Sequence, residues 1–292
     1  MVSSWRVDCG FAGFQVMETD LAEVLFPHVL GPAVVAFVGG GGKTSLMFAL
    51  ARQLAASRGL RVLCTTTTKM LPPVAPRDSD AVVSTDDLDD ALGQVALAMH
   101  SSSDGAGFGG GGGRVVALVG AKRDQGGVRA CGVSAAWIPQ FLRAADRGCC
   151  DVVLVEADGS RRRPLKAPAP HEPVLPAGLT HAVAVCGIDA LGAVLDEDDG
   201  AVFRVPEVAA VTGLALGSVL TAEALAACIA QRGVWGVPAA GVVFACCVNK
   251  CDDEPRAARA REVARCAERY APDLFIVAGQ AERGRGLVWP NR

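Results

Sequence analysis

The segment Gly39–Ser45 has the residue types and the spacing of a phosphate-binding loop. Four consecutive glycines stand before a lysine and two hydroxyl residues, between the apolar run 33–38 and a helical pattern that begins at Lys43. A strand, a glycine turn and a helix in this order direct backbone N–H groups and a helix N-terminus at one anion. A complete Walker A motif would also need glycine at position 37, where this chain has Phe37. An ordinary glycine-rich turn is the alternative.

If the loop binds a nucleotide, each residue type has a definite task. The glycines let the chain approach a phosphate closely, Lys43 would contact the β- and γ-phosphates, and Thr44 would hold Mg²⁺. The nucleotide contacts expected from this segment are Gly39, Gly40, Gly41, Gly42, Lys43, Thr44 and Ser45. The cofactors expected are therefore a nucleoside triphosphate and Mg²⁺.

An acidic residue is expected at the end of a neighbouring strand, and the run 151–156 is followed by such a group. Glu156 and Asp158 stand there, and we expect Asp158 to bind Mg²⁺ directly or through water, with the N–H of Gly159 meeting the γ-phosphate. A carboxylate that only caps the strand is the alternative. In the hydroxyl-rich segment 65–70, Thr66 would sense the γ-phosphate or Mg²⁺, although threonine is also an ordinary strand residue. Lys43, Asp158 and Thr66 are the expected catalytic group.

The run 241–248 is followed by an N-K-x-D pattern, which is typical of guanine-specific P-loop proteins. Its members are Asn249, Lys250 and Asp252. Asp252 can accept hydrogen bonds from the guanine N1–H and N2–H groups, which adenine does not offer. The pattern favours GTP over ATP as the purine nucleotide.

A basic segment follows the acidic strand end. Arg161, Arg162, Arg163 and Lys166 could hold a second anionic substrate, and His171 could act as an acid, a base or a ligand. The alternative is a solvated loop stiffened by its prolines.

These residues need a sheet that brings strand ends together. Strands are expected at 33–38, 61–65, 114–119, 151–156, 181–186, 241–248 and 273–278. Helices are expected at Lys43–Ser57, Thr85–His100, Ala135–Ala145, Thr221–Arg232 and Glu254–Arg269. The alternation predicts an α/β fold of the P-loop NTPase type, a doubly wound, mostly parallel sheet with helices on both faces. We expect an N-terminal extension at 1–30, one domain at 31–280 with a flexible Gly/Ser insertion at 101–113, and a tail at 281–292.

Composition restricts the partners and the location. The 292 residues carry a net charge of −3, which gives no general attraction to nucleic acid or to an anionic membrane. Eleven cysteines without a secretory signal indicate reduced thiols. We expect a cytoplasmic protein, and the sequence does not separate this from import into an organelle.

Taken in order, VGGGGKTSLMFALARQL, TTTTKM, VLVEADGSRRRPLKAPAPHEPVLP, VCGIDALGAVLDE and VNKCD resemble the YqeC-type proteins, described as accessory proteins of selenium-dependent molybdenum hydroxylases. The resemblance covers roughly residues 30–280. It implies a P-loop nucleotide-binding protein that helps a molybdenum hydroxylase to mature, by handling its cofactor or a labile selenium or sulfur ligand. The implied partners are that enzyme or its cofactor-handling proteins, and a homodimer is also considered.

The short loop is shared with this family, whose members usually show G-A-G-G-K-T at the place of Gly39–Thr44. The strand-end N-K-x-D of the family matches Asn249–Asp252. Phe203 stands where the family often carries histidine before Arg-Pro-Glu, and any role of that histidine is in doubt here.

Three functions remain open. The first is a maturation factor in which GTP, or less favourably ATP, drives a conformational switch with slow hydrolysis. The second is a small-molecule kinase acting on an anionic substrate. The third is a non-catalytic module gated by nucleotide.

Overall fold

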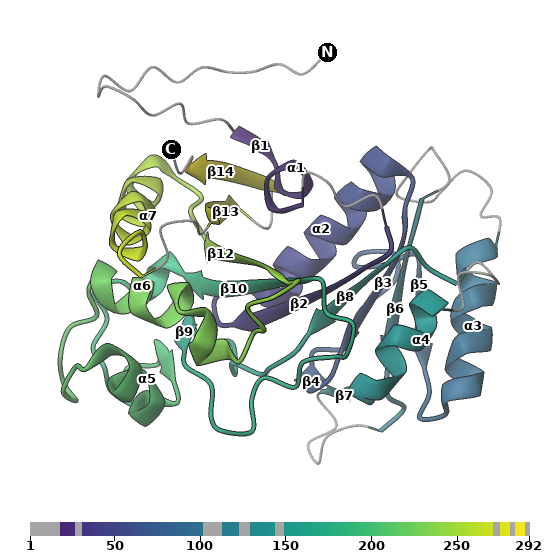
Figure 1. Ribbon diagram of the computed structural model, residues 1–292, viewed down its shortest axis with the longest axis horizontal. Coiled ribbons are helices and arrows are strands. Elements are labelled where there is room, and N and C mark those ends of the chain that lie inside the picture. The colour runs from purple at the N-terminus through teal and green to yellow at the C-terminus, as the bar shows by residue number, and fades with distance from the viewer. Residues whose placement is uncertain are drawn as a thin grey trace.

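The computed structural model describes residues 18–26, 31–101, 113–122, 129–143, 149–270, 275–280 and 284–289. Its centre is a ten-stranded sheet (Figure 1). In sheet order the strands are β1 (Glu18–Asp20), β14 (Arg285–Trp289), β13 (Phe275–Gln280), β12 (Val243–Asn249), β10 (His181–Gly187), β2 (Ala33–Gly39), β8 (Val152–Glu156), β3 (Arg61–Thr66), β6 (Arg114–Val119) and β5 (Ala81–Ser84). Only the pairings of β14 with β1 and β13 are antiparallel. The predicted mostly parallel α/β fold is confirmed.

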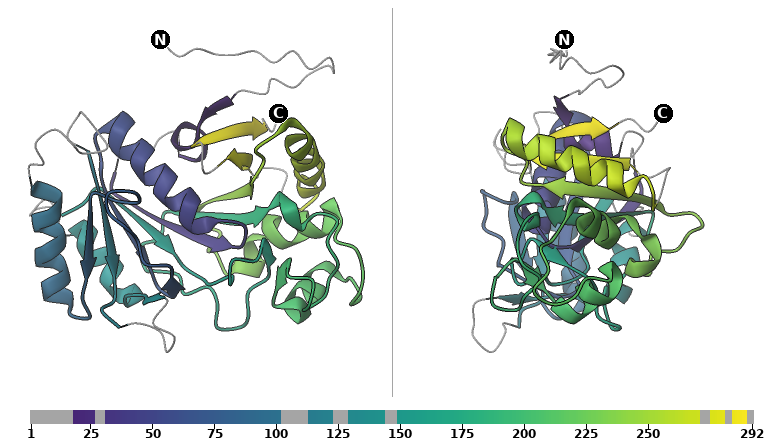
Figure 2. Two further views of the ribbon diagram at one scale, coloured as in Figure 1. Left: turned by 180° about the vertical axis from the view of Figure 1, so that it is seen from behind. Right: turned by 90° about the vertical axis from the view of Figure 1, so that its left-hand side faces the viewer.

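Helices cover both faces of the sheet because its central strands are apolar on both sides (Figures 1 and 2). One face packs against α1 (Leu21–Leu25) and α2 (Lys43–Arg58). The other face packs against α3 (Leu88–His100) and α4 (Ile138–Arg143) at one end. At its other end the cover is α5 (Val205–Thr212), α6 (Ala222–Ala230) and α7 (Glu254–Ala267).

Short elements connect the larger ones. The β-pairs are β4 (Lys69–Met70) with β7 (Ala130–Cys131), antiparallel, and β9 (Leu165–Lys166) with β11 (Val202–Phe203), parallel. The 3₁₀ turns are η1 (Ala135–Trp137), η3 (Ile188–Ala190) and η4 (Arg232–Trp235).

The expected element boundaries mostly agree with the structure. All seven expected strands are present. The helix expected to begin at Thr85 begins at Leu88, because the Asp87 carboxylate, and not the Thr85 hydroxyl, accepts from the N–H of Asp90. The Gly/Ser insertion lies mostly at 102–112, outside the described residues.

The segments expected to flank the domain contribute to the sheet. β1 lies in the expected extension 1–30 and β14 in the expected tail 281–292, and the two strands pair with each other. Together with β13 they form one end of the sheet. The sheet therefore extends beyond residues 31–280 at both ends of the chain.

The described cysteines form no disulfide, and most of them are buried. Burial raises the pKa of Cys228 and of Cys247 to about 12. Within the described part of the chain, no helix has the length and apolar character needed to cross a membrane.

Candidate nucleotide-binding site

The glycine loop follows β2 at the carboxyl edge of the sheet, where open α/β sheets bind their ligands. Gly39, Gly41 and Gly42 all have positive φ angles, of 98°, 71° and 103°. A Cβ atom at Gly41 would overlap the backbone nitrogen of Gly187 at the end of β10. Phe37 is fully buried in the apolar layer beneath α2. The loop thus turns tightly after Gly39, and position 37 belongs to the strand.

Three of the loop N–H groups hold the loop in place. The N–H of Gly39 donates to both carboxylate oxygens of Asp158, at 3.2 and 3.1 Å. The N–H groups of Gly40 and Gly41 donate to the carbonyls of Val185 (2.8 Å) and Arg163 (3.1 Å). The first part of the loop is therefore a scaffold, although Gly39, Gly40 and Gly41 were all expected to contact phosphate.

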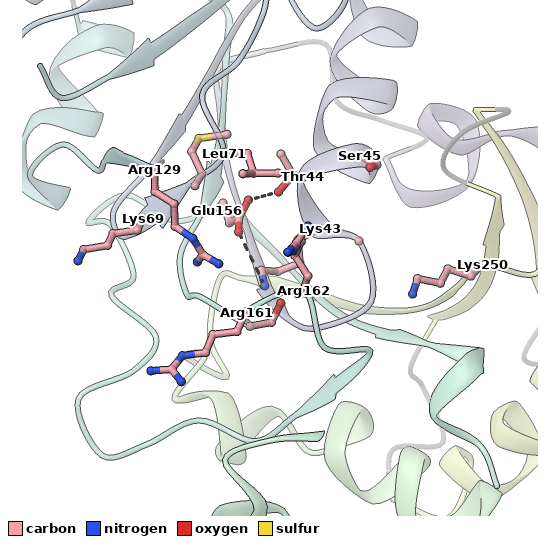
Figure 3. A pocket seen from close by; sticks show the side chains of 13 residues that line it. Lys43, Thr44, Ser45, Lys69, Leu71, Arg129, Glu156, Arg161, Arg162 and Lys250 are labelled. Carbon is pink, nitrogen blue, oxygen red and sulfur yellow. Dashed lines mark hydrogen bonds and ion pairs between the residues drawn. The ribbon is translucent and has the colours of Figure 1, made fainter. Parts of the chain in front are cut away.

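The second part of the loop faces a cavity of about 260 Å³ (Figure 3). Helix α2 begins at Lys43, and the first N–H groups of a helix have no partner within it. These groups and the helix dipole make the cavity a favourable place for an anion. The cavity is lined by Gly42, Lys43, Thr44, Ser45, Lys69, Met70, Leu71, Arg129, Glu156, Ser160, Arg161, Arg162 and Lys250.

Lys43 lies between the loop and two carboxylates. Its ammonium donates to the carbonyl of Gly39 and lies 3.3 Å from Asp158 Oδ1 and 3.9 Å from Glu156 Oε1. Its side chain is nearly fully buried yet still lines the cavity. Lys43 is therefore held at the position where a phosphate above the helix N-terminus would meet it.

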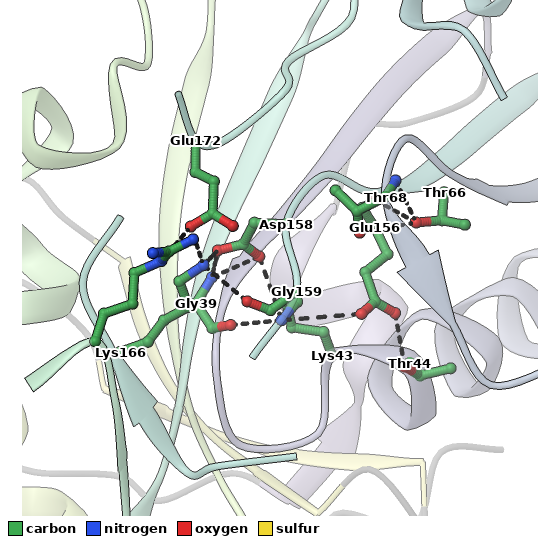
Figure 4. A network of polar contacts seen from close by, with 11 residues as sticks. Gly39, Lys43, Thr44, Thr66, Thr68, Glu156, Asp158, Gly159, Lys166 and Glu172 are labelled. Atoms are coloured by element: carbon green, nitrogen blue, oxygen red, sulfur yellow. Dashed lines mark hydrogen bonds and ion pairs between the residues drawn. The ribbon is translucent and has the colours of Figure 1, made fainter. Parts of the chain in front are cut away.

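Glu156, and not Asp158, is the carboxylate beside the loop hydroxyl. Thr44 Oγ1 donates to Glu156 Oε2 at 2.6 Å (Figure 4). Burial raises the pKa of Glu156, and the charge of Lys43 and the hydrogen bond from Thr44 partly oppose this shift. The sequence named Glu156 as part of the acidic strand end but assigned the Mg²⁺ contact to Asp158. The register that sets Glu156 opposite both Phe37 and Thr66 places it nearer the hydroxyl.

Thr44 and Glu156 fit Mg²⁺, because this ion prefers oxygen ligands and usually keeps several waters and phosphate oxygens. Among the described residues, no cluster of three or more His, Cys, Asp or Glu side chains offers a complete protein-built metal site. A Mg²⁺ ion here would therefore depend on oxygen atoms that the nucleotide supplies.

Asp158 and Lys166 belong to a buried network of charges (Figure 4). The Lys166 ammonium contacts Asp158 Oδ2 at 2.9 Å, Glu172 Oε2 at 2.7 Å and the carbonyl of Gly159 at 2.8 Å. These three acceptors match the three donors of an ammonium group. Lys166 was expected to hold an anionic substrate, and this is corrected: it is 1% exposed and its donors are fully used inside the protein.

The expectation for Thr66 is also corrected by the geometry. Thr66 is fully buried, and its hydroxyl donates to the carbonyl of Glu156 at 2.9 Å, so it joins two strand ends and does not face the cavity. The carbonyl of Gly159 accepts from Lys166, and the neighbouring Ser160 lines the cavity. The contact of the Gly159 N–H with the γ-phosphate stays a prediction.

The N-K-x-D residues stand at the end of β12, next to the loop. Asn249 is buried, and its Nδ2 donates to the carbonyl of Gly41 at 2.8 Å, so it braces the loop. Lys250, which has a positive φ of 66°, pairs with Asp189 and lines the cavity. Asp252 is partly exposed and pairs with Arg256 at 3.4 Å. Figure 3 shows Lys250 on the side of the loop away from Arg129 and Lys69.

The basic segment divides between two places. Arg161 and Arg162 are exposed and line the cavity, both with positive φ angles of 50° and 65°. Arg163 does not line it. His171 is exposed, and its Nε2 lies 3.5 Å from an Arg204 guanidinium nitrogen. Three further residues line the cavity that were not predicted as site residues: Lys69, Arg129 and Ser160. The pairing of β4 with β7 places Lys69 and Arg129 there, and the turn after β8 places Ser160.

Fold and site together define an α/β protein with a short glycine loop before a helix N-terminus, at the carboxyl edge of a mostly parallel sheet. The profile of the family described as "YqeC protein" matches residues 35–206. The uncharacterized protein YqeC of Escherichia coli (strain K12) is 36% identical over 205 residues, which cover 68% of this chain and 68% of that protein. The chain belongs to the YqeC family, and the resemblance stated from its motifs is confirmed.

Among solved structures, the chain is similar to chloroplast FtsY from Physcomitrella patens. The identity is 17%, the TM-score is 0.41, and the match covers 92% of this chain and 69% of the other. A likeness at this level carries no argument about the ligand, so the ligand is argued below from the site itself.

Proposed function

We propose that this protein binds a purine nucleoside triphosphate with Mg²⁺ at the loop after β2. One observation carries the proposal: the N-terminus of α2, the Lys43 ammonium and the Thr44–Glu156 pair all meet at one cavity of about 260 Å³. The helix N-terminus and Lys43 suit the phosphates. Thr44 and Glu156 suit the ion, which when bound would offset negative charge on the phosphate oxygens.

The base is proposed to be guanine. Asn249 joins the N-K-x-D segment to the loop through Gly41, so the segment and the phosphate site are fixed relative to each other. Asp252 is only partly exposed and has only Arg256 as a salt-bridge partner among the described residues. Its carboxylate supports guanine over adenine because it can accept two N–H groups that adenine lacks.

Isothermal titration with GTP, GDP, ATP and ADP in the presence of Mg²⁺ tests both the nucleotide site and the preference for guanine. Lys43→Ala should weaken binding of every nucleotide at least about tenfold, because it removes a charged donor to phosphate. Lys122→Ala, which removes an exposed lysine that does not line the cavity, is the matched control. Asp252→Ala should weaken GTP and GDP only. Full affinity in Lys43→Ala would reject the loop as the site, and equal binding of ATP and GTP would reject the choice of base.

In the cell, we propose that nucleotide binding and slow hydrolysis drive a conformational switch of this protein during the maturation of a molybdenum hydroxylase. Membership in the YqeC family supports this role through the family description given above. The test is the molybdenum content and activity of the hydroxylase in cells deleted for this protein. Wild type should restore both and Lys43→Ala should not. Restoration by Lys43→Ala would contradict a nucleotide-driven role.

A further inference from the structure

A second cavity, of about 330 Å³, lies beside the first and has a different lining. It is formed where β11 pairs with β9 and where α5 begins. Its polar lining consists of Arg161, Arg163, Arg204, Glu197 and Glu207. Phe203, Val202, Val205 and Pro206 supply an apolar wall. Cavities of a few hundred Å³ with an apolar wall and a few polar groups are typical small-molecule sites.

Three arginines and two glutamates line this cavity. Arg204 is paired with Glu172 at 2.9 Å and lies 3.9 Å from Glu207. Arg161 and Arg163 form no salt bridge within the residues that the structure describes. Two guanidinium groups are thus available, and guanidinium matches phosphate in both charge and hydrogen-bond geometry.

The arginines are held in place around an aromatic ring. The guanidinium carbons of Arg161 and Arg204 lie 5.1 and 5.0 Å from the centre of the Phe203 ring, and Lys166 Nζ lies 5.5 Å from it. Cations above an aromatic ring are attracted by its electrons. Arg161 and Arg204 also adopt positive φ angles, which are uncommon outside glycine and concentrate at functional sites.

We propose that this cavity binds a second small molecule, a phosphate ester whose organic part packs against the apolar wall. The guanidinium groups of Arg161 and Arg163, which form no salt bridge within the described residues, would donate to the phosphate oxygens of the ester. The structure connects this cavity with the loop in two ways. Arg161 lines both cavities, and a chain of contacts runs from Gly39 through Asp158, Lys166 and Glu172 to Arg204.

This chain of contacts makes the two sites depend on each other. A ligand that draws Arg204 toward the cavity would loosen its pair with Glu172, and the change would pass through Lys166 to the carboxylate that holds Gly39. The phosphate ester and the nucleotide should therefore alter each other's affinity by the same factor. The location of the phosphate-ester site stands without the nucleotide, whereas the coupling rests on the proposed function.

Titration calorimetry of the full chain tests the site, with phenyl phosphate as the probe and inorganic phosphate as its reference. The loop is first saturated with the nucleotide and Mg²⁺ that bind it best. Phenyl phosphate should bind more tightly than inorganic phosphate, and Arg163→Gln should weaken it at least about tenfold. Arg162→Gln is the matched control, since it removes the same charge from the adjacent residue, which lines only the first cavity.

The outcomes separate this proposal from the function proposed above. Binding that is lost in Arg162→Gln but kept in Arg163→Gln would place the probe at the loop and overturn the second site. No binding of phenyl phosphate to wild type would also overturn it. If nucleotides fail to bind but Arg163→Gln still abolishes phenyl phosphate binding, the second site stands and the function of the loop does not.

Discussion

Two carboxylates at the end of β8, two residues apart, have separate tasks. Glu156 meets the hydroxyl of Thr44 at the cavity, whereas Asp158 is fully buried between Lys43 and Lys166 and anchors Gly39. Removing one partner of a buried ion pair leaves the other charge without compensation. The two residues should therefore fail in different ways when they are changed to their amides.

Glu156→Gln should act on the metal and Asp158→Asn on the fold. We expect Glu156→Gln to raise the Mg²⁺ concentration needed for nucleotide binding at least about tenfold and to keep the protein folded. Asp158→Asn should lower the free energy of unfolding by about 3–5 kcal/mol. Nucleotide titrations at several Mg²⁺ concentrations test the prediction for Glu156→Gln, and urea unfolding tests the prediction for Asp158→Asn. An Asp158→Asn protein as stable as wild type would contradict the anchoring role.

Glu172 makes the buried network sensitive to acid. Burial alone would raise the pKa of Glu172, but hydrogen bonds from Arg204 and Lys166 and the charges of these residues outweigh it and lower this pKa. A lowered folded-state pKa stabilises the protein above the unfolded-state pKa of roughly 4.3. That stabilisation is lost as the pH falls from there through the folded-state pKa.

Urea unfolding between neutral and strongly acidic pH checks this sign. The free energy of unfolding of wild type should fall over that acid range, and Glu172→Gln should reduce the slope. Glu268→Gln, an exposed residue at the end of α7, serves as the control with the slope of wild type. An unchanged slope in Glu172→Gln would show that the network does not depend on this carboxylate.

At the scale of elements, the loop requires glycine where an ordinary helix does not. Gly41→Ala would place a Cβ against the backbone of β10 at a positive φ of 71°. We expect it to lower the free energy of unfolding by at least about 1–3 kcal/mol and to abolish nucleotide binding. Gly93→Ala lies inside α3, where the new Cβ would meet no side chain or neighbouring element within 4 Å, and it should raise stability by about 0.5–1 kcal/mol. Equal stability of both variants in chemical denaturation would argue against a tightly packed loop.

The elements that the sequence predicts well are those whose pattern is local. Strands such as β2 and β10 are apolar on both faces and read as continuous runs. Strand β5 was not predicted, because it is a short edge strand whose residues are partly exposed and form no long apolar run. Helix α5 was also not predicted. The residue before it, Arg204, has a left-handed backbone conformation, which is not a usual start signal for a helix.

The site residues also divide into those that a local sequence pattern predicts and those that depend on how the strands pack. The loop, Lys43 and Thr44 are adjacent in the chain and could be predicted together. The roles of Glu156, Lys166 and Thr66 could not, because they depend on the register between β8, β2 and β3 and on the packing of β9. Asn249 was predicted as a base contact. Its bond to Gly41 could not be predicted, because it depends on β10 lying between β2 and β12.

At the scale of the whole molecule, the sheet order explains why one edge holds both cavities. Strands β12, β10, β2 and β8 follow one another in the sheet, so their carboxyl ends bring the loop, the acidic pair and the N-K-x-D segment to one edge. The second cavity is formed by the connection from β8 to β10, which carries β9, and by the connection from β10 to β12, which carries β11 and α5. Two ligands could then be held side by side on one rigid sheet.

Hydrogen–deuterium exchange, followed with and without GTP and Mg²⁺, tests the central claim most directly. The loop should bind phosphate through backbone N–H groups at the start of α2, so peptides spanning residues 39–45 should exchange more slowly with nucleotide. Weaker protection is expected at 249–252. If nucleotide binds but protects other segments and leaves 39–45 unchanged, the loop after β2 is not the nucleotide site.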